Sequence, residues 1–208
     1  MKGLLVKDIY VISKYAKTYL VIFGFYAVFS FYTGDTGFLS GMTVLLAALM
    51  TITSFSYDDL AKWDKYARSL PVTKREIVLS KYLLGFVLTV AGAILSLVGT
   101  ALFHLIDKNG TLLPEQLATS YALSALAVVF LCILLPLIFR FGVEKSRLMM
   151  FAVFLIPTLA VVALSKMNVQ MPTEDQLMLA LKVSPVILVV LVALSFLISC
   201  RIYRNRET

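Results

Sequence analysis

The longest polar interval of this 208-residue chain runs from Asp58 to Lys81 and contains six lysines or arginines and four acidic residues. Its acidic pair, Asp58 and Asp59, is the first place where metal-dependent chemistry could occur. A two-metal phosphotransfer site would need further aspartates at fixed spacing, and none follows. We therefore interpret the pair as acidic residues at a helix N-terminus, where the helix dipole stabilises negative charge.

The residue patterns of other catalytic centres are also missing from the sequence. The chain has no G-x-x-x-x-G-K-[ST] motif and so cannot bind ATP through a P-loop. Its single histidine, His104, cannot supply the histidine pair of a membrane metalloprotease. Cys132 and Cys200 lie in apolar runs and match no metal-binding spacing. We expect no catalytic, cofactor-binding or metal-binding residue in this chain, and a membrane-embedded enzyme is the least favoured alternative.

The composition of the chain is that of a membrane protein. Mean hydropathy is +0.91, and the 15% of residues that are charged are too few to cover a water-soluble globule. The apolar runs are too long, and alternate too little, for the strands of a membrane barrel. They predict an all-α, polytopic membrane protein with six transmembrane helices. The predicted spans are about 19–33, 38–57, 82–106, 117–139, 148–165 and 183–200.

The distribution of positive charge predicts the orientation of these spans. Of the 19 lysines and arginines, only Lys108, Lys166 and Lys182 fall on the side of the membrane opposite to the N-terminus. The positive-inside rule then places both termini in the cytoplasm. The same excess of positive charge favours contact with anionic lipid head groups, and we expect no binding of nucleic acid.

Residues 1–18 form a separate predicted region before the transmembrane domain, 19–208. Leu5, Ile9 and Ile12 recur at helical spacing, while Lys7 and Lys14 fall on another face. This pattern predicts an interfacial elbow helix that lies along the inner leaflet. A simple positively charged start to the first span is the alternative.

The apolar residues of the 58–81 segment fall on one face of a short predicted helix: Leu60, Trp63, Tyr66, Ala67 and Leu70. Pro71 should end that helix. Thr73 and Glu76 then have the spacing of a capping box, which would start the next helix. The residues alone leave two interpretations of the aromatic face open. It is either a docking surface for a partner protein or a set of anchors at the membrane interface.

The second predicted cytoplasmic loop, 140–147, is a short charged connection between two spans. It contains Arg140, Glu144 and Lys145. Gly142 lies among them and can adopt a left-handed conformation that Phe141 and Val143 could not adopt cheaply.

Inside the predicted spans, small residues are present and charged ones are not. No Asp, Glu, Lys or Arg lies deep inside a span, which argues against a carrier driven by protons or sodium ions. Gly85, Gly92 and Gly99 recur every seven residues along the third span, with Ser96 between the last two. Such a stripe predicts close helix packing, either within the subunit or across a dimer.

The two loops carry a family resemblance. The stretch "WDKYARSLPVTKREIVLSKYLLG" (63–85) resembles the first cytoplasmic loop of small six-helix ABC-2 type permeases. The stretch "PLIFRFGVEKSR" (136–147) resembles their second loop. This group includes the permeases of bacterial exporters for phenol-soluble modulins and of related antimicrobial-peptide exporters. Sharp motif matches are confined to these two loops.

The resemblance implies the permease subunit of an ABC exporter in the bacterial plasma membrane, but says little about the substrate. The uncharged spans favour amphipathic or hydrophobic peptides, or similar compounds, as the cargo. Two permease chains, identical or different, would pair with two cytoplasmic ATPase subunits, and these would bind ATP and magnesium. The first loop would contain the coupling helix that meets the ATPase. Its matching positions are Trp63, Tyr66, Leu70, Pro71 and Lys74, and those of the second loop are Arg140, Gly142, Glu144 and Lys145.

A membrane immunity or regulatory subunit is the alternative function. Such a protein would use the same loop to bind an ATPase or another partner without transporting anything.

Overall fold

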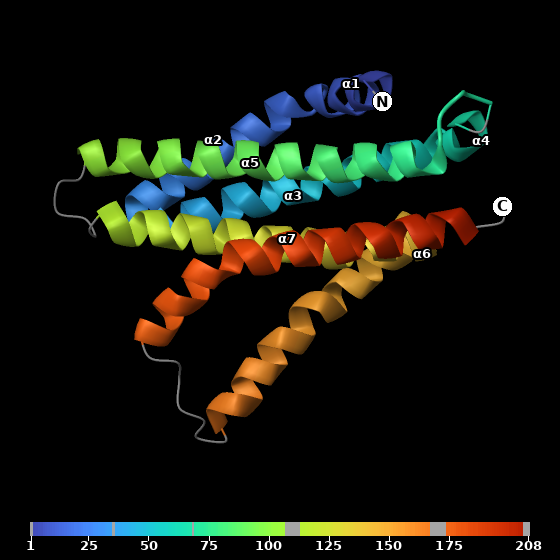
Figure 1. Cartoon of the computed structure of the whole chain (residues 1–208). Helices are drawn as coiled ribbons and strands as arrows, with labels where there is room; N and C mark the ends of the chain where they lie inside the picture. The colour runs from blue at the N-terminus through green and yellow to red at the C-terminus, as the bar shows by residue number, and fades with distance from the viewer. Residues whose placement is uncertain (1, 35, 68, 107–112, 167–173, 206–208) are drawn as a thin grey trace. The chain divides into compact units, whose positions relative to one another are not determined.

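The computed structural model describes residues 2–34, 36–67, 69–106, 113–166 and 174–205, and all regular structure in these ranges is α-helical (Figure 1). The all-α fold class predicted from the sequence is thus confirmed. The helices are α1 (Lys2–Ser13), α2 (Ala16–Thr33), α3 (Thr36–Leu60), α4 (Trp63–Ala67), α5 (Lys74–Ile106), α6 (Leu113–Lys166) and α7 (Glu174–Asn205). The chain divides into two compact units, residues 1–131 and 132–208.

Four helical segments in the described ranges are long and apolar enough to cross a membrane. They are Gly37–Leu60, Lys74–Leu102, Gln116–Val153 and Lys182–Asn205. These segments contain the second, fourth and sixth predicted spans and most of the third, 82–106. The first predicted span lies in α2, which is only 18 residues long and includes Lys17 and several tyrosines. The fifth, 148–165, follows the fourth within α6. The chain is thus a multi-pass membrane protein, and the full set of six spans stays a prediction.

Local sequence signals explain several helix boundaries in the first unit. Gly34 ends α2 in a left-handed conformation, with φ 70°, and donates its N–H to the Ser30 carbonyl at 2.9 Å. Glycine is favoured there because a side chain would strain a backbone with positive φ. Lys62, with φ 50°, separates α3 from α4. The chain can therefore turn sharply after α3, at some conformational cost to a non-glycine residue.

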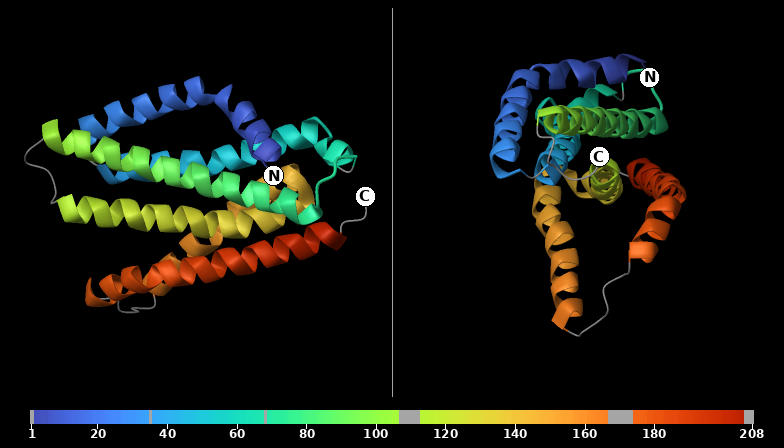
Figure 2. Two further views of the ribbon diagram at one scale, coloured as in Figure 1. Left: turned by 45° about the horizontal axis from the view of Figure 1, so that its top comes forward. Right: turned by 90° about the vertical axis from the view of Figure 1, so that its left-hand side faces the viewer.

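Close packing of α3 against α5 forms the core of the first unit, and the two helices run side by side (Figures 1 and 2). Gly92 makes this approach possible, because a Cβ added to it would lie 2.6 Å from the Ala47 Cβ. A Cβ on Gly99 would lie 3.0 Å from a methyl group of Leu39. The glycine stripe thus packs within the chain, the first of the two arrangements that its spacing allowed.

Gly85 and Ser96 complete this stripe. A Cβ on Gly85 would be in ordinary contact with Thr51 and Leu131, at 3.4–3.5 Å. Ser96 is fully buried, and its hydroxyl has no hydrogen-bond partner among the described residues. We infer that position 96 contributes to the interface through its small size and not through a hydrogen bond.

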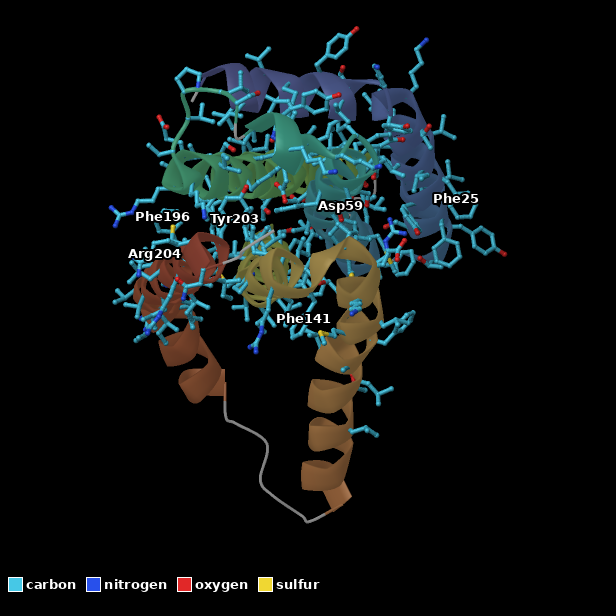
Figure 3. The ribbon with its side chains drawn as sticks, turned by 90° about the vertical axis from the view of Figure 1, so that its right-hand side faces the viewer. Phe25, Asp59, Phe141, Phe196, Tyr203 and Arg204 are labelled. Carbon is cyan, nitrogen blue, oxygen red and sulfur yellow. The ribbon has the colours of Figure 1, made fainter. Side chains whose placement is uncertain are left out.

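Several other hydroxyl groups in the first unit hydrogen-bond across helices or to the backbone of their own helix. The side chains of Ser40 and Ser120 hydrogen-bond to each other at 3.1 Å and join α3 to the start of α6. Thr89 donates to the carbonyl of Gly85 at 2.8 Å. These bonds matter because hydrocarbon offers a buried hydroxyl no other partner. The outer faces are apolar; Phe25, for example, projects outward from α2 (Figure 3) and is 66% exposed.

The second unit contains the rest of α6 and α7. Ser195 on α7 donates to the Cys132 carbonyl at 2.6 Å, and the rings of Phe139 and Tyr203 pack edge to face. Cys132 and Cys200 are half-buried and form no disulfide, as expected from their apolar surroundings. At Gly142 the ribbon of α6 changes direction (Figure 1).

Replacement of Gly92 by alanine tests the close packing. We expect Gly92→Ala to lower the free energy of unfolding by about 1–3 kcal/mol, because its Cβ meets Ala47 and overpacks the interface. The measurement is the thermal unfolding midpoint of the full chain in detergent.

Gly24→Ala is the matched control, since nothing lies within 4 Å of the position that a Cβ would take there. Alanine is the better helix former, and this variant should be neutral or slightly more stable. Adding Ala47→Gly to Gly92→Ala should restore stability. Equal midpoints for Gly92→Ala and Gly24→Ala would contradict the packing.

Candidate functional site

The 58–81 segment consists of the end of α3, the short helix α4 and the first turns of α5. Two sequence-based expectations need correction. Asp58 and Asp59 lie in the last turn of α3 and not at a helix N-terminus. The predicted helix through residues 60–70 contains only Trp63–Ala67, because Lys62 breaks it before Trp63 and it ends four residues ahead of Pro71.

The predicted capping box at the start of α5 is confirmed. The Thr73 N–H donates to Glu76 Oε2 at 2.8 Å, and the Glu76 N–H donates to Thr73 Oγ1 at 3.3 Å. Both bonds satisfy backbone donors that the first turn of a helix leaves without intrahelical partners. The capped turn gives α5 a defined start next to the exposed Lys74.

The apolar side chains of the segment are divided between the interior and the surface. Ala67 is buried and Trp63 half-buried. Leu60, Tyr66 and Leu70 are 77%, 65% and 43% exposed. We call these three the exposed apolar patch. The single continuous face expected from helical spacing is therefore not formed, since Leu60 belongs to α3 and Leu70 follows α4.

Four charged residues from three helices, Lys7, Asp8, Asp58 and Lys81, form an ion cluster. We call it the buried ion cluster after its interior pair, Asp8 and Lys81, which are buried. Lys7 Nζ lies 3.1 Å from Asp8 Oδ1 and 2.5 Å from Asp58 Oδ1. Lys81 Nζ lies 2.9 Å from Asp8 Oδ1 and 2.5 Å from Asp58 Oδ2. Two ammonium groups and two carboxylates thus balance one another, and each group contacts both groups of opposite charge.

The interior pair of this cluster is almost completely removed from solvent. The side chains of Asp8 and Lys81 are 2% and 4% exposed. The Ser54 hydroxyl donates to Asp8 Oδ1 at 3.0 Å, and Lys81 Nζ donates to Ser54 Oγ at 2.8 Å. Lys81 Nζ also lies 4.9 Å from the centroid of the Phe55 ring. Buried charges need such partners, because desolvation otherwise outweighs their attraction.

The ion cluster fixes α1 across α3 and α5, which α1 contacts at the end that carries α4 (Figure 2). Asp8 comes from α1, Asp58 from α3 and Lys81 from α5. The side-chain hydroxyls of Tyr15 and Tyr57 add a hydrogen bond between the end of α1 and α3. The base of the 58–81 segment is therefore held by ionic and hydrogen bonds and not by apolar packing alone.

Lys7 connects the cluster to α4. Its Nζ lies 4.1 Å from the centroid of the Trp63 ring, within the range of a cation–π interaction. Trp63 is thereby held against α1, and the exposed apolar patch lies on either side of it in the sequence. Trp63 is thus in contact with Lys7, whereas Leu60, Tyr66 and Leu70 stay exposed.

The role of Asp8 was not predicted from the sequence. Helical spacing grouped Leu5, Ile9 and Ile12 on one apolar face of an interfacial helix. The structure buries Leu4, Asp8 and Ile12 within the protein and leaves Ile9 51% exposed. A signal was present, since Asp8 is the one acidic residue in the first 34 positions and lies four residues from both Leu4 and Ile12. An acidic residue at helical spacing from two apolar ones indicates a buried partner of opposite charge.

Residues 140–147, predicted as the second loop, lie in the other compact unit and are part of α6, whose helical backbone is interrupted only at Gly142. Arg140, Glu144 and Lys145 are exposed, and the Arg140 guanidinium lies 5.1 Å from the centroid of the Phe141 ring. Gly142 has φ 79° and ψ 174°. The positive φ expected for Gly142 is confirmed, but the extended ψ belongs to a region open almost only to glycine and not to the left-handed helical region.

Removal of one charge tests the ion cluster. We expect Lys81→Met to cost about 3 kcal/mol of unfolding free energy, because Asp8 and Asp58 then share one lysine in a buried site. Lys17→Met, at an exposed position, should cost less than about 0.5 kcal/mol. Denaturant unfolding in detergent measures both.

A double-mutant cycle separates the ionic contribution from lost packing. The effects of Asp8→Asn and Lys81→Met should be non-additive by about 1–3 kcal/mol. Additive losses would mean that Asp8 and Lys81 do not interact.

Comparison with known proteins gives the family of the chain. Residues 3–204 match the family described as ABC-2 family transporter protein. No curated protein and no solved structure matches the chain. The match covers nearly all of the sequence, including both loops and all seven helices of the described structure. The chain therefore belongs to the ABC-2 transporter family, as the membrane component of an ABC transporter and not its ATPase.

Proposed function

We propose that this chain is the permease of an ABC exporter for amphipathic or hydrophobic peptides, or similar compounds, in a bacterial plasma membrane. Family membership supports a permease that works with an ABC ATPase. The ATPase binds ATP and magnesium and supplies the free energy for transport. The exposed apolar patch, on a segment whose base is fixed by the buried ion cluster, is the observation that carries this proposal.

The proposed topology has six spans, with both termini in the cytoplasm. In addition to the four long apolar segments, α2 forms the first span and the part of α6 after Gly142 forms the fifth. Helix α1 is the interfacial elbow. Its Val6, Ile9 and Tyr10 are 51–65% exposed, which suits a helix whose outer face meets acyl chains and head groups.

The 58–81 segment acts as the coupling element. Leu60, Tyr66 and Leu70 would be unfavourable in water, and a groove on the ATPase would cover them. Pro71 and Lys74 are exposed beside them and complete the contact surface. Exposed aromatic residues of this kind often dominate the energetics of an interface.

Closure of the ATPase would reach the spans through the buried ion cluster. A force on α4 passes through Trp63 to Lys7, and from there to α3 and α5 through Asp58, Asp8 and Lys81. Because the cluster is buried and fully paired, it moves as one body with the helix ends. The exposed loop residues Arg140, Glu144 and Lys145 form a second contact with the ATPase.

A second permease chain completes the transporter. The glycine stripe of Gly85, Gly92 and Gly99 is already occupied by neighbours within the chain. The contact with the second chain therefore uses another face. Copurification with a tagged chain distinguishes two identical permeases from two different ones: it yields either a second copy of this chain or another permease.

The nature of the cargo follows from the lining of the spans. The apolar stretches 38–57, 82–106, 117–139 and 183–200 contain no Asp, Glu, Lys or Arg. A strongly hydrated solute would find no groups to replace its water there, whereas an amphipathic peptide can keep its apolar face against such helices.

Loss of Tyr66 tests the coupling element. We expect Tyr66→Ala to reduce binding of the ATPase about tenfold or more, since an exposed aromatic anchor is lost. The measurement is the amount of ATPase that copurifies with a tagged chain. Tyr32→Ala is the control, because Tyr32 is 91% exposed at the other end of the membrane domain. Equal amounts of ATPase with both variants would refute the assignment.

Stimulation of ATP hydrolysis tests the cargo. In nanodiscs, the complete complex should hydrolyse ATP faster when an amphipathic helical peptide is added, and vesicles containing it should move that peptide across the membrane. Stimulation by small hydrophilic solutes alone would exclude this cargo. If the ATPase binds but no peptide is moved, the immunity or regulatory function is the correct one.

A further inference from the structure

An apolar cavity of about 320 Å³ lies between α2, α3 and α5 in the first unit. The floor is formed by α3 and the nearest turn of α5, where Thr43, Ala47 and Gly92 are buried. Leu20 on α2 and Ala91 and Leu95 on α5 are exposed and form the rim. The cavity therefore opens toward the medium that surrounds the helices.

The lining of the cavity offers no free polar group. Tyr19 and Thr43 are its polar residues. The Tyr19 hydroxyl hydrogen-bonds to Thr53 at 3.4 Å, and the Thr43 hydroxyl donates to the Leu39 carbonyl at 2.7 Å. A water molecule needs two to four polar partners to be held in a cavity. The lining therefore selects an apolar occupant.

The size and position of the cavity fit a hydrocarbon chain. Its volume is roughly twice that of an engineered apolar cavity that binds benzene. The lining residues of α2 run from Ala16 to Phe23, a length of about 10 Å along the helix axis. One leaflet contributes about 15 Å of the hydrocarbon core. The cavity can thus hold most of one acyl chain that enters from a single leaflet.

Positive charge lies at one end of the cavity. Ala16 lines it, and the next residue, Lys17, is exposed and has no ion-pair partner among the described residues. Lys14, two residues before Ala16, is also exposed, with its ammonium over the Tyr10 ring. An ammonium group at the edge of an apolar cavity complements the phosphate of a lipid head group.

We propose that this cavity binds one acyl chain of an anionic phospholipid, with Lys17 contacting its phosphate. The acyl chain fills the space between α2 and α5, above the part of α3 that forms the floor. It thereby supplies packing contacts to α2 that the protein itself does not provide at the cavity. This inference rests on the membrane setting of the helices and not on the export of peptides, so either one can fail alone.

Native mass spectrometry of the purified transporter, equilibrated with phosphatidylglycerol and then washed with detergent, tests the site. The wild type should retain a phosphatidylglycerol molecule. Ala91→Phe places a ring in the cavity rim and should reduce retention about tenfold. Ala101→Phe is the matched control, since Ala101 is exposed on the same helix but does not line the cavity. Equal retention by the two variants would overturn the site.

The head group and the occupant are tested separately. Lys17→Gln should lower retention of phosphatidylglycerol but not that of phosphatidylcholine, whose head group is neutral overall. A photo-crosslinking amino acid at Leu95, on the cavity rim, should yield a lipid adduct. If it instead captures a second copy of the chain or a cargo peptide, the cavity has another occupant and the lipid proposal is wrong.

Discussion

Four paired charges, two of them buried, hold together the end of the first unit that carries the candidate site. Asp8 and Lys81 are nearly inaccessible to solvent, and both reach Asp58 or Lys7 within ion-pair distance. The other contacts of the chain are largely apolar and set no fixed orientation. The ion pairs of the cluster do, because each charged group must lie close to its partners. The cluster fixes the angle of α1 against α3 and α5, since both lysines must face both carboxylates. Without the cluster, α4 would be attached only through its chain connections to α3 and α5. The exposed apolar patch would then have no defined position.

The close packing of α3 and α5 makes that cluster geometrically available. Gly92 brings the two backbones together opposite Ala47, and the same contact continues toward Ser54 and Lys81 at the end of the helices. In hydrocarbon, water provides no driving force between helices, so close approach through small residues matters more than apolar area. The glycine stripe and the ion cluster are thus parts of one interface. Helices α2 and α5 do not close over α3 beside this interface, and the apolar cavity lies between the two helices.

Rigid attachment and surface exposure are combined within the 58–81 segment. Trp63 faces inward to Lys7, whereas Tyr66 is open to solvent only three residues later. Sequence spacing alone had grouped the two aromatic residues on one face, as either docking residues or membrane anchors. The break at Lys62 separates their roles, because a five-residue helix preceded by a sharp turn presents its faces independently of α3. The segment therefore combines an exposed apolar patch with a base that the ion cluster fixes to α1, α3 and α5.

Features that depend only on neighbouring residues could be predicted before the fold was known. Hydropathy identified the apolar helices, the spacing of Thr73 and Glu76 predicted the capped start of α5, and the glycine at position 142 predicted a positive φ. Such signals are local, since a capping bond or a backbone angle involves only a few consecutive residues. The folded chain was needed to show that Asp8 pairs with Lys81, 73 positions away, and that Gly92 packs against Ala47. A residue on a helix could contact any of several neighbouring helices, and its sequence position does not say which. The packing of α1, α3 and α5 decides which contact forms.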